Sequence, residues 1–373
     1  MNLHMRKVLL LFATVSSLFV SCDKDDDHKP EEDPLSVWVY RAGTQFEENS
    51  SQAVYMKNKQ KVILPSIDGM SSTATDIQIS GNDVYVVGTA GERRDHSFDV
   101  VKALLWKNDR VEELKVPNSK IAFASAIFVA GDDVYVAGTY LPEAEGSTQR
   151  GVVWKNGIPM DIGKKDVHTR LEDIFVLGGD VYLAGYENHQ GGIVSKYWRN
   201  GVEKVLSKKE VTTYARSIYV DNSDVYLAGY ADAIGDRSVK LWKNGVPTSL
   251  IPSKSVTRGY GVTVDKGNVY VAGYQQVGSH YVPKVFKNNE LLPIEHTAGR
   301  HSYAFSVQIV NDNIYVWGWE ETGDSLRHLI WENGKEIEFI TTYDKYLSLS
   351  SMVVVEIYDV IKAGNADETK VFF

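Results

Sequence analysis

Residues 225–245 contain the two runs that decide the fold: Val225-Tyr226-Leu227-Ala228-Gly229-Tyr230 and Leu241-Trp242-Lys243-Asn244-Gly245. Both runs begin with the branched and aromatic residues that are typical of β-strands. The Asn-Gly pair favours a type I′ hairpin turn, because both central residues of that turn need positive φ. The stretch therefore predicts two strands and a tight turn into a third.

The first run recurs seven times along the chain. Each copy has a tyrosine three residues before a glycine. The tyrosines are Tyr40, Tyr85, Tyr135, Tyr182, Tyr226, Tyr270 and Tyr315, and the glycines are Gly43, Gly88, Gly138, Gly185, Gly229, Gly273 and Gly318. Successive tyrosines lie 45, 50, 47, 44, 44 and 45 residues apart. A period of this length indicates a repeat fold.

The second run also recurs in every repeat, as a large residue, a usually basic residue and an asparagine. The copies are Met56-Lys57-Asn58, Trp106-Lys107-Asn108, Trp154-Lys155-Asn156, Trp198-Arg199-Asn200, Trp242-Lys243-Asn244, Phe286-Lys287-Asn288 and Trp331-Glu332-Asn333. Glycine follows the asparagine at Gly157, Gly201, Gly245 and Gly334. These four copies predict the same hairpin turn.

Each repeat contains four short β-type runs. An alternating run such as Ile218-Tyr219-Val220 comes first, followed by the tyrosine run, a polar loop, the tryptophan run and a last strand. Four-stranded units of about 45 residues predict an all-β fold, the β-propeller. Because each blade packs on both of its neighbours, we expect the side chains of the repeated Tyr and Trp residues to be buried between blades.

The ends of the chain set the number of blades. Six repeats have all four strands, from Asp76 to about Ile340. The first repeat lacks its first strand and begins around Trp38-Val39-Tyr40, whereas Met352-Val353-Val354-Val355 is an orphan strand. Together these ends form one composite N/C-terminal blade, so we predict a seven-bladed β-propeller over residues 37–355. We assign no role to the tail, residues 356–373.

Residues 1–21 have the features of a signal peptide. His4, Arg6 and Lys7 precede an apolar run from Val8 to Val20, which is shorter than a bilayer-spanning helix. The run ends in Leu18-Phe19-Val20-Ser21-Cys22, which resembles a bacterial lipobox whose cysteine becomes lipidated, with palmitate as a typical acyl group. Phe19 stands where leucine is usual. The alternative is an ordinary signal peptide with a chance cysteine.

Residues 22–36 are rich in charge and proline, so we expect a disordered acidic tether after the lipidated Cys22. An acidic run at this place resembles the surface-export signal of Bacteroidota lipoproteins. Across about residues 37–355 the chain resembles the β-propeller-repeat lipoproteins of the same bacteria. The resemblance implies an outer-membrane protein, anchored by lipid and exposed at the surface. The alternative is a tether that faces the periplasm.

Composition excludes several classes of function. The chain has 40 basic and 49 acidic residues, a formal charge of −9, which argues against sequence-independent nucleic-acid binding. Cys22 is the single cysteine, so neither an intramolecular disulfide framework nor a cysteine-based zinc site exists. No two histidines have metal-ligand spacing, and no Asp-x-Asp-x-Asp-Gly loop occurs. We therefore expect no metal and no cofactor.

Catalytic residues are not evident. Gly323-Asp324-Ser325-Leu326 looks like the signature of GDSL esterases, but that serine belongs to an α/β sheet, whereas this one lies in a loop of an all-β chain. We interpret it as a chance match and assign no catalytic residue. The sequence favours a non-enzymatic role.

Aromatic and basic residues coincide on four consecutive repeats. Directly after the repeat glycine lie Tyr186, Tyr230, Tyr274 and Trp319, and in the loops that reach the same end lie Arg170, Arg216, Arg258 and Arg300. Aromatic faces stack on sugars or peptide side chains, and arginine binds carboxylate or sulfate bidentately. These eight residues form the predicted ligand site. The alternative is that the rings pack on the next blade and the arginines pair with Glu172, Asp173 or Asp221.

The sequence thus predicts a lipid-anchored binding or scaffold module whose favoured ligand is a glycan or another extracellular polymer. Its expected partners are the membrane, through Cys22, and a glycan or protein on the loop face. Two other classes remain open: a propeller that helps to assemble an outer-membrane complex, and a glycan-cleaving hydrolase or lyase.

Overall fold

The computed structural model describes residues 37–94, 97–208, 210–233, 235–251, 256–323, 325–342 and 347–356. The predicted signal peptide, the tether with Cys22, and residues 357–373 of the tail lie outside the described residues. Within the described ranges the regular secondary structure is β throughout. The prediction of an all-β fold is confirmed.

Five sheets are separate four-stranded blades. One combines β28 (Leu347–Glu356), β1 (Val37–Phe46), β2 (Ser51–Lys57) and β3 (Gln60–Ile63). The next two comprise β12 (His168–Leu177), β13 (Asp180–His189), β14 (Gly192–Arg199) and β15 (Val202–Val205), and then β16 (Thr213–Asp221), β17 (Asp224–Ala231), β18 (Val239–Lys243) and β19 (Val246–Ser249). The last two comprise β20 (Thr257–Asp265), β21 (Asn268–Val277), β22 (His280–Lys287) and β23 (Glu290–Leu292), and then β24 (Ser302–Val310), β25 (Asn313–Thr322), β26 (Ser325–Glu332) and β27 (Lys335–Thr342).

The sixth sheet has eight strands, which differs from the prediction of seven separate blades. It joins two antiparallel sets: β4 (Ser71–Ser80), β5 (Asp83–Arg94), β6 (Ser97–Lys107) and β7 (Arg110–Glu113), with β8 (Ser119–Ala130), β9 (Asp133–Pro142), β10 (Arg150–Lys155) and β11 (Ile158–Ile162). The link is one parallel pairing, Val101 of β6 with Ile121 of β8. Both strands are long enough to meet at that point, so the two sets share one sheet.

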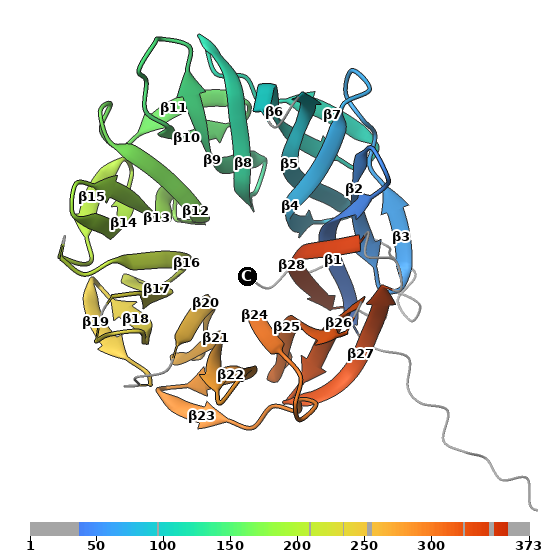
Figure 1. The fold of residues 1–373 in the computed structure, drawn as a ribbon, viewed down its shortest axis with the longest axis vertical. Helices are drawn as coiled ribbons and strands as arrows, with labels where there is room; N and C mark the ends of the chain where they lie inside the picture. The colour runs from blue at the N-terminus through green and yellow to red at the C-terminus, as the bar shows by residue number, and fades with distance from the viewer. Residues whose placement is uncertain are drawn as a thin grey trace, which may run out of the picture. The chain divides into compact units, whose positions relative to one another are not determined.

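The sheets stand around a central axis as a β-propeller (Figure 1). The inner strands β4, β8, β12, β16, β20, β24 and β28 line a central cavity of about 200 Å³. The ring closes where β28 pairs antiparallel with β1, with Val354 opposite Val39. This pairing confirms the predicted composite blade.

The repeated asparagine has the same two functions in every repeat. Its backbone φ lies at 49° to 55° in all seven copies, from Asn288 to Asn108, as the predicted turn requires. Its side-chain oxygen accepts a hydrogen bond from the backbone N–H at the start of the tyrosine strand, for example 2.8 Å from Val225 N to Asn244 Oδ1. The side chain therefore fastens the turn to the neighbouring strand.

The repeated tryptophans fill the spaces between blades, as predicted. Trp106, Trp154, Trp198, Trp242 and Trp331 are at most 1% exposed. Four of their indole N–H groups donate to a carbonyl of the preceding repeat, as Trp242 Nε1 does to Leu206 O at 3.2 Å. Burial of such large rings supplies much of the apolar contact between blades.

Every inner strand carries a one-residue bulge at the same place. The bulged residues are Thr75, Ser125, Glu172, Arg216, Tyr260, Phe305 and Ser350. The repeat glycine lies opposite the residue before the bulge, where the inner strand's carbonyl comes close. A Cβ on Gly88, for instance, would lie 1.9 Å from Thr73 O. The bulge thus explains the glycine in each repeat.

Candidate functional site

The predicted ligand residues lie at one end of four neighbouring blades. Arg170 of β12 is directly opposite Tyr186 of β13, and Arg258 of β20 is opposite Tyr274 of β21. Trp319 of β25 holds the corresponding place beside Tyr303 of β24. The strand register therefore brings the predicted arginines and aromatic residues to the same end of the sheets.

The aromatic side chains form one continuous series of ring contacts, the aromatic arc. Centroid distances are 5.1 Å for Tyr186–Tyr214, 4.9 Å for Tyr214–Tyr230 and 6.1 Å for Tyr230–Tyr260. The series continues across the next blades and ends at Trp319, whose ring centroid is 4.1 Å from that of Tyr303. The arc comprises Tyr186, Tyr214, Tyr230, Tyr260, Tyr274, Tyr303, Phe305 and Trp319.

Members of the aromatic arc differ in exposure. Tyr230 and Tyr274 are 3% and 7% exposed, so both rings are packed among their neighbours. For these two residues the alternative, that the rings pack instead of binding a ligand, agrees with the structure. Tyr186 and Trp319 are half-buried, as are Tyr260 and Phe305. The buried rings pack against the half-buried rings, which retain part of their surface for contact with solvent.

Each predicted arginine has an acidic partner. Arg170 and Arg216 both lie 2.9 Å from Glu172 Oε1, and Arg258 lies 3.4 Å from Asp232 Oδ2. Glu172 was the partner foreseen by the alternative expectation. Asp173, also named there, instead accepts hydrogen bonds from the backbone N–H groups of Ile174 and Ile218. These ion pairs hold the guanidinium groups in place.

Arg216 is the centre of the arginine set. Its guanidinium carbon lies 5.4 Å, 5.7 Å and 5.8 Å from the ring centroids of Tyr214, Tyr230 and Tyr260. One nitrogen donates to Tyr230 Oη at 3.1 Å. Burial by itself would lower the pKa of Arg216. The nearby Glu172 and Tyr230 have a larger, opposite effect, so the pKa lies above the ordinary value of arginine. Arg216 therefore stays positively charged among aromatic rings.

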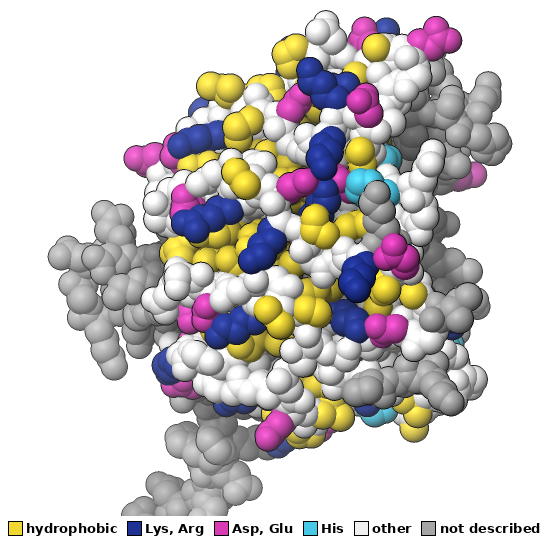
Figure 2. Space-filling model, turned by 90° about the vertical axis from the view of Figure 1, so that its left-hand side faces the viewer, with side chains coloured by type: hydrophobic (Ala, Val, Ile, Leu, Met, Phe, Trp, Pro, Cys, Tyr) yellow, Lys and Arg dark blue, Asp and Glu magenta, His cyan; other side chains and the backbone are white. Residues whose placement is uncertain are grey.

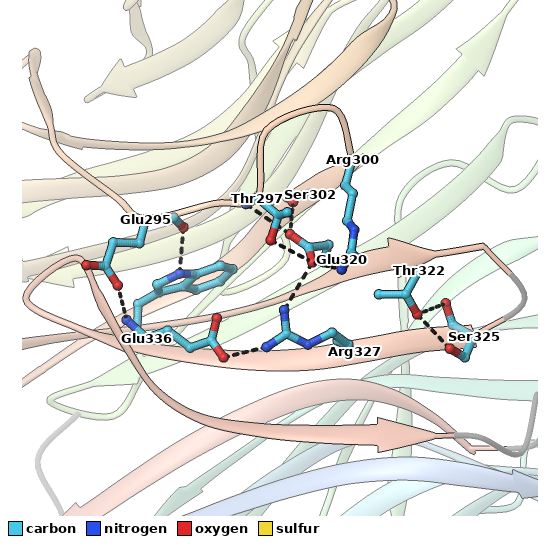
Figure 3. A network of polar contacts seen from close by, with 10 residues as sticks. Glu295, Thr297, Arg300, Ser302, Glu320, Thr322, Ser325, Arg327 and Glu336 are labelled. Carbon is cyan, nitrogen blue, oxygen red and sulfur yellow. Dashed lines mark hydrogen bonds and ion pairs between the residues drawn. The ribbon is translucent and has the colours of Figure 1, made fainter.

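Arg300 belongs to a different network, centred on Glu320 (Figure 3). Glu320 is 1% exposed and accepts bonds from Thr297, Arg300, Ser302 and Arg327 at 3.0 to 3.1 Å. Burial alone would raise the pKa of Glu320, but these hydrogen bonds lower it. Arg300 thus neutralises a buried carboxylate and joins a loop to the blade, which is a structural task.

Sequence reasoning missed the bulged residues as a group. Four of them touch in succession: Glu172 with Arg216 at 2.9 Å, Arg216 with the Tyr260 ring at 5.8 Å, and Tyr260 with Phe305 at 5.1 Å. We call these four residues the mouth cluster, because each is followed by a residue that lines the central cavity. A signal was present: six bulged residues stand ten positions before a repeat tyrosine.

Two carboxyl groups line the central cavity. Asp76 Oδ2 accepts from Ile127 N, and Asp173 Oδ2 from Ile218 N, so each joins two inner strands. Burial raises the pKa of Asp76 to about 6 and that of Asp173 to about 7, although the backbone hydrogen bonds act in the opposite direction. Both groups therefore titrate near neutral pH.

Three further properties of the described part of the chain bear on its chemistry. No group of three or more His, Cys, Asp or Glu residues there is placed to hold a metal ion. Ser325 of the esterase-like tetrapeptide begins β26, and its hydroxyl lies 2.6 Å from Thr322 Oγ1. No helix among the described residues is long and apolar enough to cross a membrane.

Comparison with known proteins supports the fold. No family model matches the sequence, and no curated protein matches it either. A puromycin-hydrolyzing peptidase of Mycobacterium tuberculosis is similar in structure, with a TM-score of 0.52 at 11% identity over 83% of this chain and 53% of that one. This likeness concerns the propeller alone.

Two further structures are more distant. A Trypanosoma rangeli sialidase, in complex with the inhibitor DANA, gives a TM-score of 0.41 at 10% identity, over 81% of this chain and 58% of the sialidase. A Pyrococcus horikoshii acylaminoacyl peptidase gives 0.47 at 12% identity, over 85% and 50%. The chain spans only 50% to 58% of the length of these three proteins.

Proposed function

We propose that this protein is a cell-envelope binding module that captures a glycan or another extracellular polymer at one end of its propeller. The observation that carries the proposal is the aromatic arc, which runs without a gap across four neighbouring blades and is flanked by three fixed arginines. Stacking of sugar rings on aromatic faces gives affinity without a catalytic group. An arc of this length suits several successive units of a polymer.

The proposed location follows from the sequence. A lipid on Cys22, with residues 22–36 as a tether, would hold the propeller at the outer membrane and at the cell surface. One acyl chain binds a membrane only reversibly, so stable anchoring needs more than one chain, as bacterial lipoprotein modification provides. We further propose that the eight-stranded sheet acts as two blades, because two of its strands, β4 and β8, line the cavity as inner strands. The ring would then have seven units.

A binding screen tests the proposal. The full-length protein in detergent is applied to a panel of neutral and acidic polysaccharides, and both retention and the release of reducing ends are measured. Retention without products supports a binding module, whereas product release would make it an enzyme. Failure to retain any polysaccharide would contradict the proposed ligand class.

Substitution of half-buried rings locates the site. Trp319→Ala should weaken retention of a bound polysaccharide about tenfold or more, as loss of an aromatic anchor commonly does. Trp38→Ala is the matched control, since that half-buried ring lies at the opposite end of its blade beneath Lys57. Equal losses in both variants would point to general destabilisation.

A second candidate function, a scaffold for an outer-membrane complex, has an observation of its own. The outer strands expose Ile158 at 72%, Val202 at 72% and Val246 at 68%. Figure 2 shows this rim, where hydrophobic side chains stand among Lys, Arg, Asp and Glu side chains. Co-purification of a stoichiometric membrane protein, lost in the variant Val202→Asp with Val246→Asp, would favour the scaffold.

A further inference from the structure

The seven bulged positions are equivalent in the fold but not in chemistry. Thr75 Oγ1 donates to Ala124 O at 2.9 Å, and Ser350 Oγ donates to Ala74 O at 2.9 Å. In both cases a small hydroxyl joins one inner strand to the next. At these positions the bulged side chain therefore has a structural task.

The four bulged residues of the mouth cluster are different. Glu172, Arg216, Tyr260 and Phe305 replace the small hydroxyls with a carboxylate, a guanidinium and two rings. The side chains of Arg216 and Glu172 are 23% and 12% exposed, and Tyr260 and Phe305 are half-buried. A bulge turns its side chain away from the regular ladder, and bulges recur beside functional sites. The larger groups consequently contact one another directly before the residues that line the cavity.

The ion pairs in and around the mouth cluster contain more arginines than carboxylates. Arg170 and Arg216 share Glu172, while Arg237 and Arg258 share Asp232. Four guanidinium groups thus meet two carboxylates, on a chain whose formal charge is −9. The Nε atoms of Arg216 and Arg258 are buried and have no hydrogen-bond partner among the described residues. The arginines in and around the cluster therefore give this end of the propeller a positive excess that favours an anion.

We propose that the mouth cluster recognises a carboxylated sugar unit, so that the polymer of the proposed function is an acidic polysaccharide. The sugar carboxylate would lie against Arg216 and Arg258, where planar guanidinium groups match its two oxygens. The sugar ring would stack on Tyr260, and Phe305, whose ring plane is inclined by 76° to that of Tyr260, would contact its edge. Glu172 positions Arg216 through their ion pair. The inference rests on the proposed function and narrows its ligand.

The test compares polygalacturonate with highly methyl-esterified pectin, which has the same sugar backbone but few free carboxylates. Full-length protein in detergent is titrated with each polymer by calorimetry at low salt. We expect binding of polygalacturonate at least tenfold tighter, and a decline as salt is raised. Equal binding of both polymers, or binding of neutral polysaccharides alone, would overturn the inference while leaving the proposed function intact. No binding of any polysaccharide would overturn both.

Variants assign the effect to the mouth cluster. Arg216→Met keeps the aliphatic stem but loses the charge, and should lower affinity for polygalacturonate at least tenfold without changing that for the ester. Arg216→Lys retains the charge and should keep part of the affinity even where Arg216→Met folds poorly. Arg199→Met is the matched control, since that arginine pairs with Asp180 at the opposite end. Wild-type affinity in Arg216→Met, or equal binding of dextran sulfate, would refute carboxylate recognition.

Discussion

Gly229 and Tyr214 are in contact through the backbone alone: a Cβ added to Gly229 would lie 1.9 Å from the carbonyl oxygen of Tyr214. The bulge at Arg216 brings this carbonyl across the neighbouring strand. The same approach recurs in the other blades, at 1.8 to 2.4 Å for the repeat glycines. The glycine of each repeat therefore leaves room for the bulge in the inner strand, and in four repeats the bulged residue belongs to the mouth cluster.

Gly229→Ala should destabilise the protein by about 1–3 kcal/mol, the usual range for overpacking, because strand β16 must move away from the new methyl group. Chemical denaturation measures the loss. Gly131→Ala is a useful comparison, since Gly131 has open space around it and a φ of 60°. That variant has only the backbone strain of a left-handed residue, about 1–2 kcal/mol, and no steric clash. A Gly229→Ala protein as stable as wild type would disprove the steric account.

Closure of the ring by β28 gives a second prediction. Removal of residues 347–373 exposes the inner edge of β1, because its antiparallel partner from Leu347 to Glu356 is lost. The truncated protein should melt at a lower temperature and aggregate, as open strand edges do. A synthetic peptide of residues 347–356, added in trans, should raise the melting temperature again. An unchanged melting temperature after truncation would mean that the pairing contributes little.

Asp173 and Asp76 make stability depend on pH. Their folded-state pKa values of about 7 and about 6 lie above the ordinary value of 3.8, so the folded state binds these protons more tightly than the unfolded state. Stability from these groups is present at pH 4 and is lost as pH rises through 6 and 7. For Asp173 the loss is at most about 4 kcal/mol, at about 1.4 kcal/mol for each pKa unit.

The measurement is the melting temperature of wild type and Asp173→Asn from pH 5 to pH 8. The decline with pH should be shallower in the variant, which has no charge to bury. His328, whose pKa burial lowers to about 4, acts in the opposite sense but is present in both proteins. Asp133→Asn is the control, because Lys155 and Asn156 lower the pKa of Asp133 and place its titration below this range. Parallel curves for wild type and Asp173→Asn would contradict the prediction.

Cys22→Ala should release the protein from the membrane fraction. The expected anchor is a lipid on this residue, and its loss removes the acyl chains that partition into the bilayer. Cell fractionation with a salt wash, followed by immunoblotting, measures the distribution. Ser21→Ala keeps a small residue before the cysteine and should leave the protein in the membrane. Retention of Cys22→Ala in washed membranes would disprove the lipid anchor.

The fold could be predicted from the sequence repeat. Tyrosine, glycine, tryptophan and asparagine at constant spacing predicted four-stranded blades, and the positive φ of Asn244 and the burial of Trp242 confirm the tasks assigned to them. The orphan strand near Val354 was likewise correctly paired with the first repeat. The turns and the strand pattern follow from local rules, because they depend on neighbours in the chain. The pairing of the orphan strand is long-range and followed from counting the strands of each repeat.

For the candidate site the sequence determined only part of the arrangement. It placed Arg170, Tyr186 and their counterparts at one end of four blades, since alternating strand directions follow from the hairpins. It did not distinguish buried Tyr230 from half-buried Trp319, nor foresee that Arg300 neutralises Glu320. Ring packing and ion pairing between different blades join residues far apart in the chain, so their outcome depends on how the blades meet.

The sequence by itself determined the repeat and the turns, because both arise from hydrogen bonds and periodicity within a few tens of residues. It also indicated the closure of the ring, although β1 and β28 come from opposite ends of the chain, because the first repeat lacks the strand that the last run supplies. Only the tertiary structure decided that Val101 meets Ile121 and merges two sets of strands into one sheet. It also decided that the bulges bring Glu172, Arg216, Tyr260 and Phe305 into one chain of contacts. The bulges form between adjacent strands of one repeat, but the contacts between bulged residues and the pairing of β6 with β8 join separate repeats, and that geometry exists only once the ring is formed.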